Sequence, residues 1–162
     1  MLTEALHTDH PAADRAAGLE LYGWLVGEWN FTGWIQPADN TKHDIRGEIH
    51  AGWVLEGRAI QDVWIVPGFF HGTTLRIYDP GLGAWHIIWS DPLRQSYSRQ
   101  MGRASGKNIV QDGGNLNGTT TRWSFVDRTN DSFRWLGERL AGPDNWVLEA
   151  EFLVSRSRDD HC

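Results

Sequence analysis

The chain has 162 residues and a formal net charge of -6, from 15 Lys and Arg against 21 Asp and Glu. This length suits one domain, and an acidic balance without a basic cluster argues against nucleic acid and anionic membrane as partners. No apolar run reaches the ~18 residues of a membrane span, and the N-terminus lacks the basic-then-apolar order of a signal peptide, so we expect a soluble, cytoplasmic protein.

Two residue types stand out in the composition. Cys162 is the only cysteine, which excludes an intrachain disulfide and a thiolate-rich metal site. The chain also has 10 Trp, a residue that buries a large area with few rotatable bonds. Such a chain builds a strongly packed core or a rigid aromatic cavity, and in a small barrel the two occupy the same place.

The chain begins with a short polar segment and one helix. Residues 1–11 hold few apolar side chains, and we expect a flexible N-terminal arm there. From Ala12 to about Leu25, alanines and leucines recur at spacings that form an apolar helix face. This is the one helix that the sequence predicts.

Beyond Gly27 the chain consists of short segments rich in aromatic and β-branched residues, separated by turn signals. Ten strands are predicted: Glu28–Gln36, His43–Leu55, Arg58–Val66, Gly72–Tyr78, Ala84–Ser90, Gln95–Ala104, Lys107–Asp112, Thr119–Val126, Ser132–Leu140 and Trp146–Ser155. The breaks between them, such as Pro37–Asn40, Asp79–Gly81 and Gly113–Asn115, favour tight turns.

Short connections make consecutive strands antiparallel neighbours, and a meander of this length removes its open edges by closing on itself. The predicted fold class is therefore all-β: an up-and-down antiparallel barrel of about ten strands, capped by the one N-terminal helix. We expect a single barrel domain over residues 12–156 and a C-terminal tail over 157–162.

Alternation along several strands predicts which side chains face inward. In the last strand the inward set is Trp146, Leu148, Ala150, Phe152 and Val154. The same count groups Trp123 with Phe125, Phe133 with Trp135, and Trp85 with Ile87 and Trp89. The third strand is apolar on both faces, so its orientation stays open.

Five short motifs carry a resemblance to a known family: Leu25–Trp29, Tyr78–Pro80, Trp89–Pro92, Arg122–Phe125 and Phe133–Trp135. Over about residues 20–156 the chain resembles the lipocalin-like, or calycin-like, bacterial β-barrels of unknown function, whose opening has the pattern Gly-x-Trp. The resemblance implies that Trp29 closes one end of the barrel beneath Arg156, in a cation-π contact of about 1 kcal/mol. It implies a fold and no particular activity.

The ligand-binding residues of two better-defined groups of similar barrels are missing from this sequence. Nitrobindin-like barrels hold haem through a histidine of the C-terminal half, but this chain has no histidine between His86 and His161. Fatty-acid-binding barrels grip a carboxylate with Arg-x-Tyr on the last strand, which here contains neither residue. We therefore expect no cofactor.

A metal site is also not expected. His7 and His10 lie in the polar arm, and the odd separation of His43 and His50 places them on opposite faces of one strand. A site built from His71, His86 and a carboxylate would need convergence from different strands, which spacing does not show.

Acid-base chemistry needs a titratable group inside an apolar cavity. Asp62 and His86, both flanked by apolar strand residues, are the candidate catalytic residues, and Glu138 is a third. The alternative is that His86, Arg134 and Glu138 alternate with the aromatic face and therefore point to solvent. A buried Asp62 would need Arg58 or another donor as its partner.

Two further sets of residues share a strand face: Arg76 with Tyr78, and Tyr97, Arg99, Met101 and Arg103. If either set lined the cavity it could orient a carboxylate, phenolate or enolate. The alternative is a solvated outer face.

The sequence thus predicts binding of a small, largely apolar organic molecule in an aromatic-lined cavity. The expected ligand-binding residues are Trp64, Tyr78, Trp85, Trp89, Trp123, Phe125, Trp135 and Trp146. The alternative function is a cofactor-independent cyclase, isomerase or lyase that uses the same cavity, with Asp62 or His86 moving a proton. A purely structural role and a homodimer also stay open.

Overall fold

A computed structural model describes residues 1–37 and 41–158 of the chain. Most of the expected turn at Pro37–Asn40, the end of the expected tail over 157–162, and Cys162 lie outside these residues. The elements are α1 (Leu2–Leu6), β1 (His7–Thr8), the 3-10 helix η1 (Ala13–Arg15), α2 (Ala16–Gly23), β2 (Gly27–Ile35), β3 (His43–Val54), β4 (Ala59–Val66), β5 (Phe70–Asp79), β6 (Ala84–Asp91), β7 (Ser96–Ser105), β8 (Asn108–Asn115), β9 (Thr120–Val126), β10 (Ser132–Gly142) and β11 (Asn145–Arg156).

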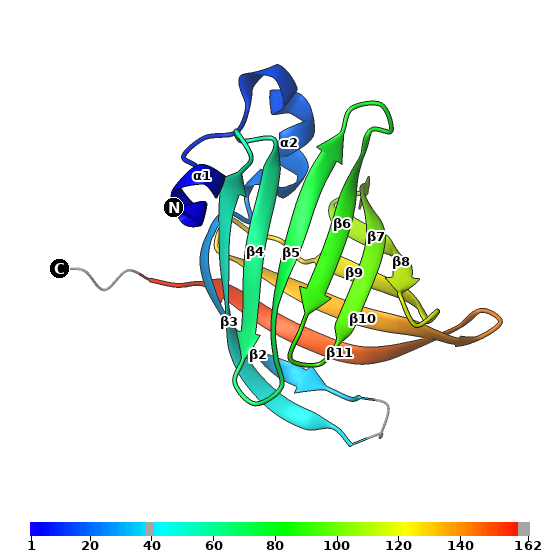
Figure 1. The fold of residues 1–162 in the computed structure, drawn as a ribbon. Helices are drawn as coiled ribbons and strands as arrows, with labels where there is room; N and C mark the ends of the chain where they lie inside the picture. Colours follow the sequence, from blue (N-terminus) through cyan, green and yellow to red (C-terminus); the bar gives the residue numbers. More distant parts are fainter. Residues whose placement is uncertain (38–40, 159–162) are drawn as a thin grey trace.

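Strands β2 to β11 form a closed, antiparallel, ten-stranded barrel, which confirms the predicted fold class. Each strand pairs with the next along the chain, and β11 returns to pair with β2, where Arg156 lies opposite Trp29. The ten predicted strands are all present (Figure 1). Closure leaves none of these ten strands with an unpaired edge.

The segment 1–11, predicted as a flexible arm, has regular structure instead. It contains α1 and the two-residue strand β1, in which His7 and Thr8 pair with Val54 and Trp53 at the end of β3. The N–H of Leu55 also donates to the carbonyl of Leu6, at 3.0 Å. Backbone pairing with β3 therefore orders a segment that has little apolar content of its own.

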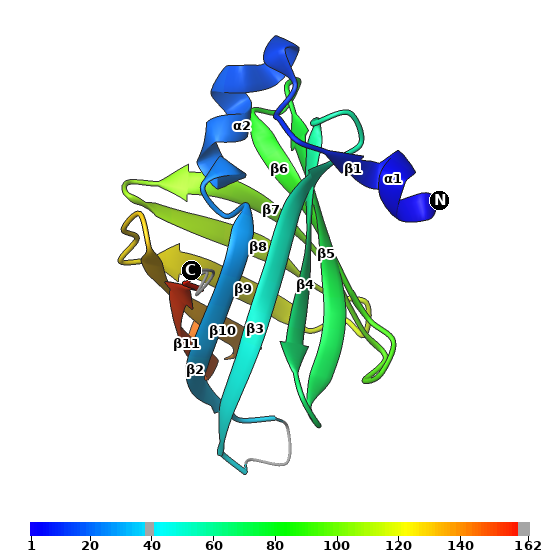
Figure 2. The same ribbon diagram turned by 90° about the vertical axis from the view of Figure 1, so that its left-hand side faces the viewer.

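Helix α2 closes one end of the barrel, as Figures 1 and 2 show. Its side chains Leu19 and Tyr22 are almost completely buried. Two glycines permit this close approach, because a Cβ at Gly18 would overlap the ring of Tyr78, and a Cβ at Gly102 would overlap the hydroxyl of Tyr22. The predicted capping role of the helix is thus explained by side-chain packing.

The contact between Trp29 and Arg156 that the resemblance implied is present. The guanidinium carbon of Arg156 lies 4.0 Å from the centroid of the Trp29 ring. The same guanidinium donates to the carbonyls of Val26, at 3.1 Å, and Trp24, at 3.0 Å. Arg156 therefore joins the last strand both to the first barrel strand and to the segment that follows α2.

The orientation of the third barrel strand, β4, is settled by burial. Ile60, Asp62 and Trp64 face the interior, while Gln61 and Val63 between them are more exposed. On β5 the interior face includes Arg76, which is 2% exposed. The alternative that Arg76 lies on a solvated outer face was therefore wrong.

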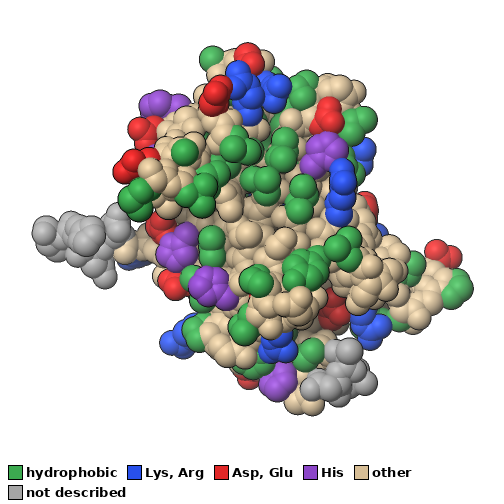
Figure 3. Space-filling view, in the orientation of Figure 1, with side chains coloured by type: hydrophobic (Ala, Val, Ile, Leu, Met, Phe, Trp, Pro, Cys, Tyr) green, Lys and Arg blue, Asp and Glu red, His purple; other side chains and the backbone are tan. Residues whose placement is uncertain are grey.

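The second set of residues, on β7, lies on the outer face of the barrel. On β7, Arg99 and Arg103 are exposed, and the buried residues that alternate with them include Ser98 and Gln100. The outer face of β5 and β6 is more apolar and includes Ile88, which is 38% exposed. Figure 3 shows hydrophobic side chains gathered on the face of the molecule that contains these strands.

A β-bulge in β11 overturns part of the predicted inward set. Ala150 pairs with Gly137, but the next pair joins Leu148 to Glu138, so Glu149 is an extra residue. Ala150, like Phe152 and Val154, is buried as expected, whereas Leu148 is 37% exposed. Because one extra residue inverts the alternation, the side chains before the bulge face the other way.

Candidate functional site

The half of the barrel interior that lies under α2 is a packed core, called here the packed half. The Tyr22 ring from α2 lies 4.9 Å from the Trp85 ring and 6.0 Å from the Phe125 ring, both in edge-to-face geometry. Trp29 and Phe133 also contact each other edge to face, with centroids 5.1 Å apart. These rings fill the space under the helix.

The other half of the interior contains a cavity of about 530 Å³. Its lining residues are Ile35, Pro37, Trp64, Phe69, Phe70, Thr74, Arg76, Trp89, Asp91, Arg94, Ser96, Asn115, Trp123, Trp135, Gly137, Glu149, Ala150 and Phe152. Several of them lie at strand ends remote from α2, so the cavity opens at the end of the barrel opposite the helix. Its volume falls within the roughly 300–1,000 Å³ that is typical of small-molecule sites.

Four tryptophans form much of the cavity wall. The centroid of Trp123 lies 6.4 Å from that of Trp89 and 5.6 Å from that of Trp135, and Trp135 lies 5.7 Å from Trp64. Phe152 stacks on Trp135 at 5.0 Å with an interplanar angle of 14°. The rings hold one another in place, so the wall is formed before any ligand binds.

The eight expected ligand-binding residues therefore separate into three groups. Trp64, Trp89, Trp123 and Trp135 line the cavity. Tyr78, Trp85 and Phe125 lie inside the barrel but in the packed half, against α2.

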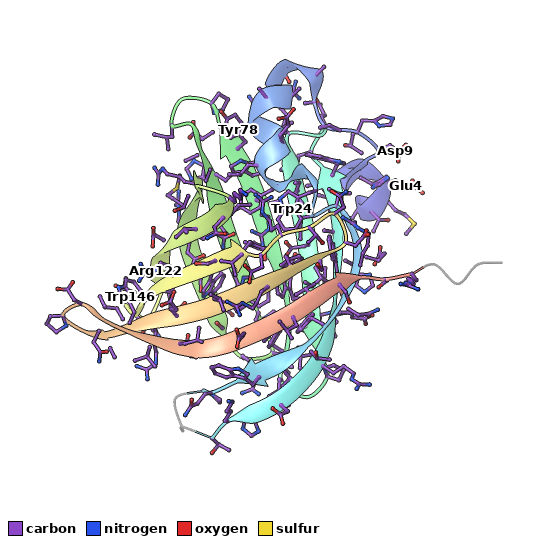
Figure 4. The ribbon with its side chains drawn as sticks, turned by 180° about the vertical axis from the view of Figure 1, so that it is seen from behind. Glu4, Asp9, Trp24, Tyr78, Arg122 and Trp146 are labelled. Atoms are coloured by element: carbon purple, nitrogen blue, oxygen red, sulfur yellow. The ribbon has the colours of Figure 1, made fainter. Side chains whose placement is uncertain are left out.

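Trp146 is in neither place. Its ring lies under the guanidinium of Arg122, with the guanidinium carbon 3.9 Å from the centroid. Figure 4 shows the two side chains together near the β10–β11 hairpin, far from Tyr78. The bulge at Glu149 explains why Trp146 does not reach the cavity, since it inverts the face on which Trp146 lies.

A buried ion pair lies where the packed half meets the cavity. The Nε of Arg76 donates to Oδ2 of Asp62 at 2.7 Å, and the two side chains are 2% and 0% exposed. Arg58, the partner suggested from sequence, is instead outside with Glu56 and Asp14. Arg76 itself lines the cavity, so the pair presents its positive partner to that space.

A chain of hydrogen bonds connects this arginine to the helix. The Nη1 of Arg76 and the hydroxyl of Tyr22 both donate to Oε1 of Gln111, at 2.7 and 2.8 Å. Gln111 donates onward to Gln100, at 2.9 Å, which donates to Thr121, at 2.8 Å. Burial raises the pKa of Tyr22, so its hydroxyl stays protonated and remains a donor.

Three polar atoms in this region have no partner in the described part of the chain. They are Oδ1 of Asp62 and the indole Nε1 atoms of Trp64 and Trp85. An unbonded polar group in a protein interior is costly, and a ligand or a water can satisfy it.

His86, the second candidate catalytic residue, lies on the outside of the barrel. Its Nε2 is 2.9 Å from Oδ2 of Asp79 on the neighbouring strand. This hydrogen bond lowers the pKa of Asp79. Glu138 is likewise outside, 3.6 Å from Arg122, so the alternation argument was right for both residues and neither reaches the cavity.

The wall also contains acidic residues that the sequence reasoning did not select. Asp91 shares a face with Trp85 and Trp89, and this alternation could have identified it. Its Oδ1 accepts from the backbone N–H of Leu93 at 3.0 Å. It therefore shapes the turn after β6.

Glu149, the bulge residue, is the other acidic residue of the wall, and nothing in the sequence marks it. It pairs with Arg139 at 3.4 Å. Burial raises the pKa of its carboxyl, and the charge of Arg139 opposes that effect. A carboxyl group in these surroundings can hold a proton at higher pH than usual.

No group of three or more metal-ligating side chains occurs within residues 1–37 and 41–158. His43 and His50 lie on opposite faces of β3, as predicted: His43 packs against Phe69, and His50 pairs with Glu28 and Glu48. None of the helices in the described ranges is long and apolar enough to cross a membrane.

No protein-family model matches the chain, and no curated protein sequence matches it. Solved structures do share its fold. The crystal structure of Rv2717c from M. tuberculosis superposes with a TM-score of 0.62 and 13% identity, covering 91% of this chain and 99% of that one. The S-type phycobiliprotein lyase CPES from Guillardia theta gives a TM-score of 0.58 and 12% identity, with the same coverage. At 12–13% identity, these matches show that the chain shares its fold with both proteins.

Proposed function

We propose that the protein binds a small, largely apolar organic molecule inside the barrel. The observation that carries the proposal is the cavity of about 530 Å³, which has an aromatic wall and one buried arginine in it. Aromatic rings supply contact area to an apolar ligand, and a few polar groups fix its orientation. A fold shared with a protein described as a phycobiliprotein lyase is compatible with this role.

The arrangement of the wall explains how such a molecule would be held. Trp64, Trp89, Trp123 and Trp135 come from four different strands, so they surround the cavity. The rings are fixed by stacking and by the barrel, so binding has little ordering cost. Arg76 is held by Asp62 and Gln111, which fixes the position of its guanidinium.

The test is a titration with N-phenyl-1-naphthylamine, an uncharged apolar dye whose fluorescence rises on leaving water. The wild-type protein should bind it saturably at one site per chain. Ala150→Phe, which fills the cavity from β11, should weaken binding by at least roughly tenfold, or about 1.4 kcal/mol. The matched control is Leu153→Phe, on the same strand but 60% exposed.

Leu153→Phe should bind the dye like the wild type. Absence of saturable binding to the wild type would contradict the proposal. Equal weakening by both variants would also contradict it, because the dye would then be bound somewhere else.

An enzyme that uses the same cavity is the second candidate, and the position of Glu149 favours it. A carboxyl whose pKa is raised by burial in an aromatic wall is suited to donate or accept a proton at a higher pH than an ordinary carboxyl. In a cyclase, isomerase or lyase of this kind, Glu149→Gln should abolish turnover of a substrate found by screening. The same variant should still bind the dye.

A further inference from the structure

The charges of the cavity balance one another. The charged lining residues are Arg76, Arg94, Asp91 and Glu149. Two of them have ionic partners behind the wall: Arg76 bonds to Asp62 at 2.7 Å, and Glu149 lies 3.4 Å from Arg139. Three acidic and three basic residues therefore meet in this region, and their formal charges sum to zero.

The hydrogen-bond donors of Arg76 are not all used within the protein. Arg76 uses its Nε on Asp62 and its Nη1 on Gln111, while its Nη2 has no hydrogen-bond partner within the described residues. A guanidinium group donates and does not accept. A ligand atom beside the Nη2 of Arg76 has to be an acceptor.

A negatively charged acceptor fits poorly at this position. Arg76 already neutralises the carboxylate of Asp62, whose Oδ1 is buried without a partner. A ligand carboxylate would add a second anion to one guanidinium inside an aromatic wall, where an unmatched charge is strongly disfavoured. A carbonyl oxygen accepts the same hydrogen bond and leaves the local charge at zero.

We infer that this cavity selects molecules whose buried end is an uncharged hydrogen-bond acceptor, such as a ketone, ester or amide carbonyl received by Arg76, and that it discriminates against the matching carboxylates. The inference rests on the proposed function and names the ligand class of that site. The Arg76 and Asp62 pair thus acts as a specificity determinant and not only as a structural ion pair.

Three naphthalene probes of nearly equal size test this inference by calorimetry at pH 8: 2-acetylnaphthalene, 2-ethylnaphthalene and 2-naphthoate. The wild type should bind the ketone roughly three- to tenfold more tightly than the hydrocarbon, the worth of one net hydrogen bond. It should bind the carboxylate more weakly than either.

The decisive variant is Asp62→Asn. Its amide oxygen can still accept from Arg76, but the guanidinium charge is no longer neutralised, so the order should reverse and 2-naphthoate should become the tightest ligand. The control is Glu138→Gln, the same change of charge on the outer face beside Arg122, which should keep the wild-type order. Melting curves check that both variants fold.

If Asp62→Asn does not fold, the double variant Asp62→Leu with Arg76→Met replaces the pair with apolar side chains. It should bind the hydrocarbon and the ketone equally.

The outcomes separate the two proposals. If the wild type binds none of the probes, the proposed function fails. If it binds the hydrocarbon but binds the carboxylate as tightly as the ketone, the cavity is a binding site and the inferred ligand class is wrong. An unchanged order in Asp62→Asn, or a ketone preference retained by the double variant, would also overturn the inference.

Discussion

Trp85 and Trp89 lie on the same face of β6, four residues apart, and have different surroundings. Trp85 is 1% exposed and packs against Tyr22 and Tyr78, whereas Trp89 lines the cavity. The two halves of the barrel interior are built from the same residue types. They differ in whether another element packs into them. Helix α2 fills the packed half with Tyr22, and no described segment fills the other half. An aromatic interior becomes a core or a cavity according to whether another element occupies it.

The Arg76 and Asp62 pair lies at the border of these halves. On one side Arg76 reaches Gln111 and, through it, Tyr22 of the helix. On the other side it lines the cavity. Disrupting this border should therefore affect stability and binding together, whereas changes within either half should affect mainly one of them.

The largest effect is expected from Arg76→Met. The substitution leaves the carboxylate of Asp62 buried without a partner, which should lower the free energy of unfolding by about 3–5 kcal/mol. The double variant Asp62→Leu with Arg76→Met should recover most of that loss, because no unmatched charge remains. Urea denaturation measures both values. Equal losses in the single and double variants would show that the two charges do not interact.

The next largest effect separates Trp85 from Trp89. Trp85→Ala removes a ring from the packed half and should cost about 3–5 kcal/mol of unfolding free energy. Trp89 lines the cavity and is only partly buried, so Trp89→Ala should remove fewer packing contacts, cost about 1–2 kcal/mol and weaken binding of the naphthylamine dye. Denaturation and dye titration of the two variants provide the comparison. If Trp89→Ala were the more destabilising change, the division into core and cavity would be wrong.

The smallest effect concerns pH and Glu149. The carboxyl has an ordinary pKa of 4.5, which burial raises in the folded protein. As pH rises above 4.5, the unfolded chain loses this proton before the folded chain does, so the group lowers stability across that window and stays unfavourable above it. Glu149→Gln should therefore gain stability relative to the wild type between pH 4 and pH 7.

Thermal unfolding at the two pH values measures this gain. Glu151→Gln is the matched control, because Glu151 lies on the same strand and forms a similar ion pair, with Arg134, but does not line the cavity. It should show no such gain. If stability changes between the two pH values by the same amount in the wild type and in Glu149→Gln, the pH effect does not come from Glu149.

The strands and their order could be predicted from local sequence. Each strand has alternating or β-branched residues, and each turn has Gly, Pro, Asn or Asp, so the meander follows from short-range rules. The pairing of Trp29 with Arg156 followed from the family resemblance, and the structure contains it. The inward face of β6 also followed from alternation.

The composition of the cavity could not be predicted in the same way. The bulge at Glu149 adds one residue without any local signal, and this alone moves Trp146 outside and brings a carboxyl to the wall. The partner of Asp62 required the orientation of β4, where both faces are apolar. The division of the interior depends on the contact of Tyr22 with Gln111, which are 89 residues apart. These features arise from long-range geometry.

The pairing of β2 with β11 has a consequence for the synthesis of the chain. The ribosome releases β2 before the other barrel strands, but β11, which covers its free edge and ends at Arg156, is made after all of them. Until then β2 and β10 each present unpaired backbone groups, which can pair with strands of other chains. Contacts between segments so far apart also form slowly. The barrel therefore closes only after all ten of its strands have emerged, and a nascent or truncated chain that lacks β11 has two edges open to aggregation.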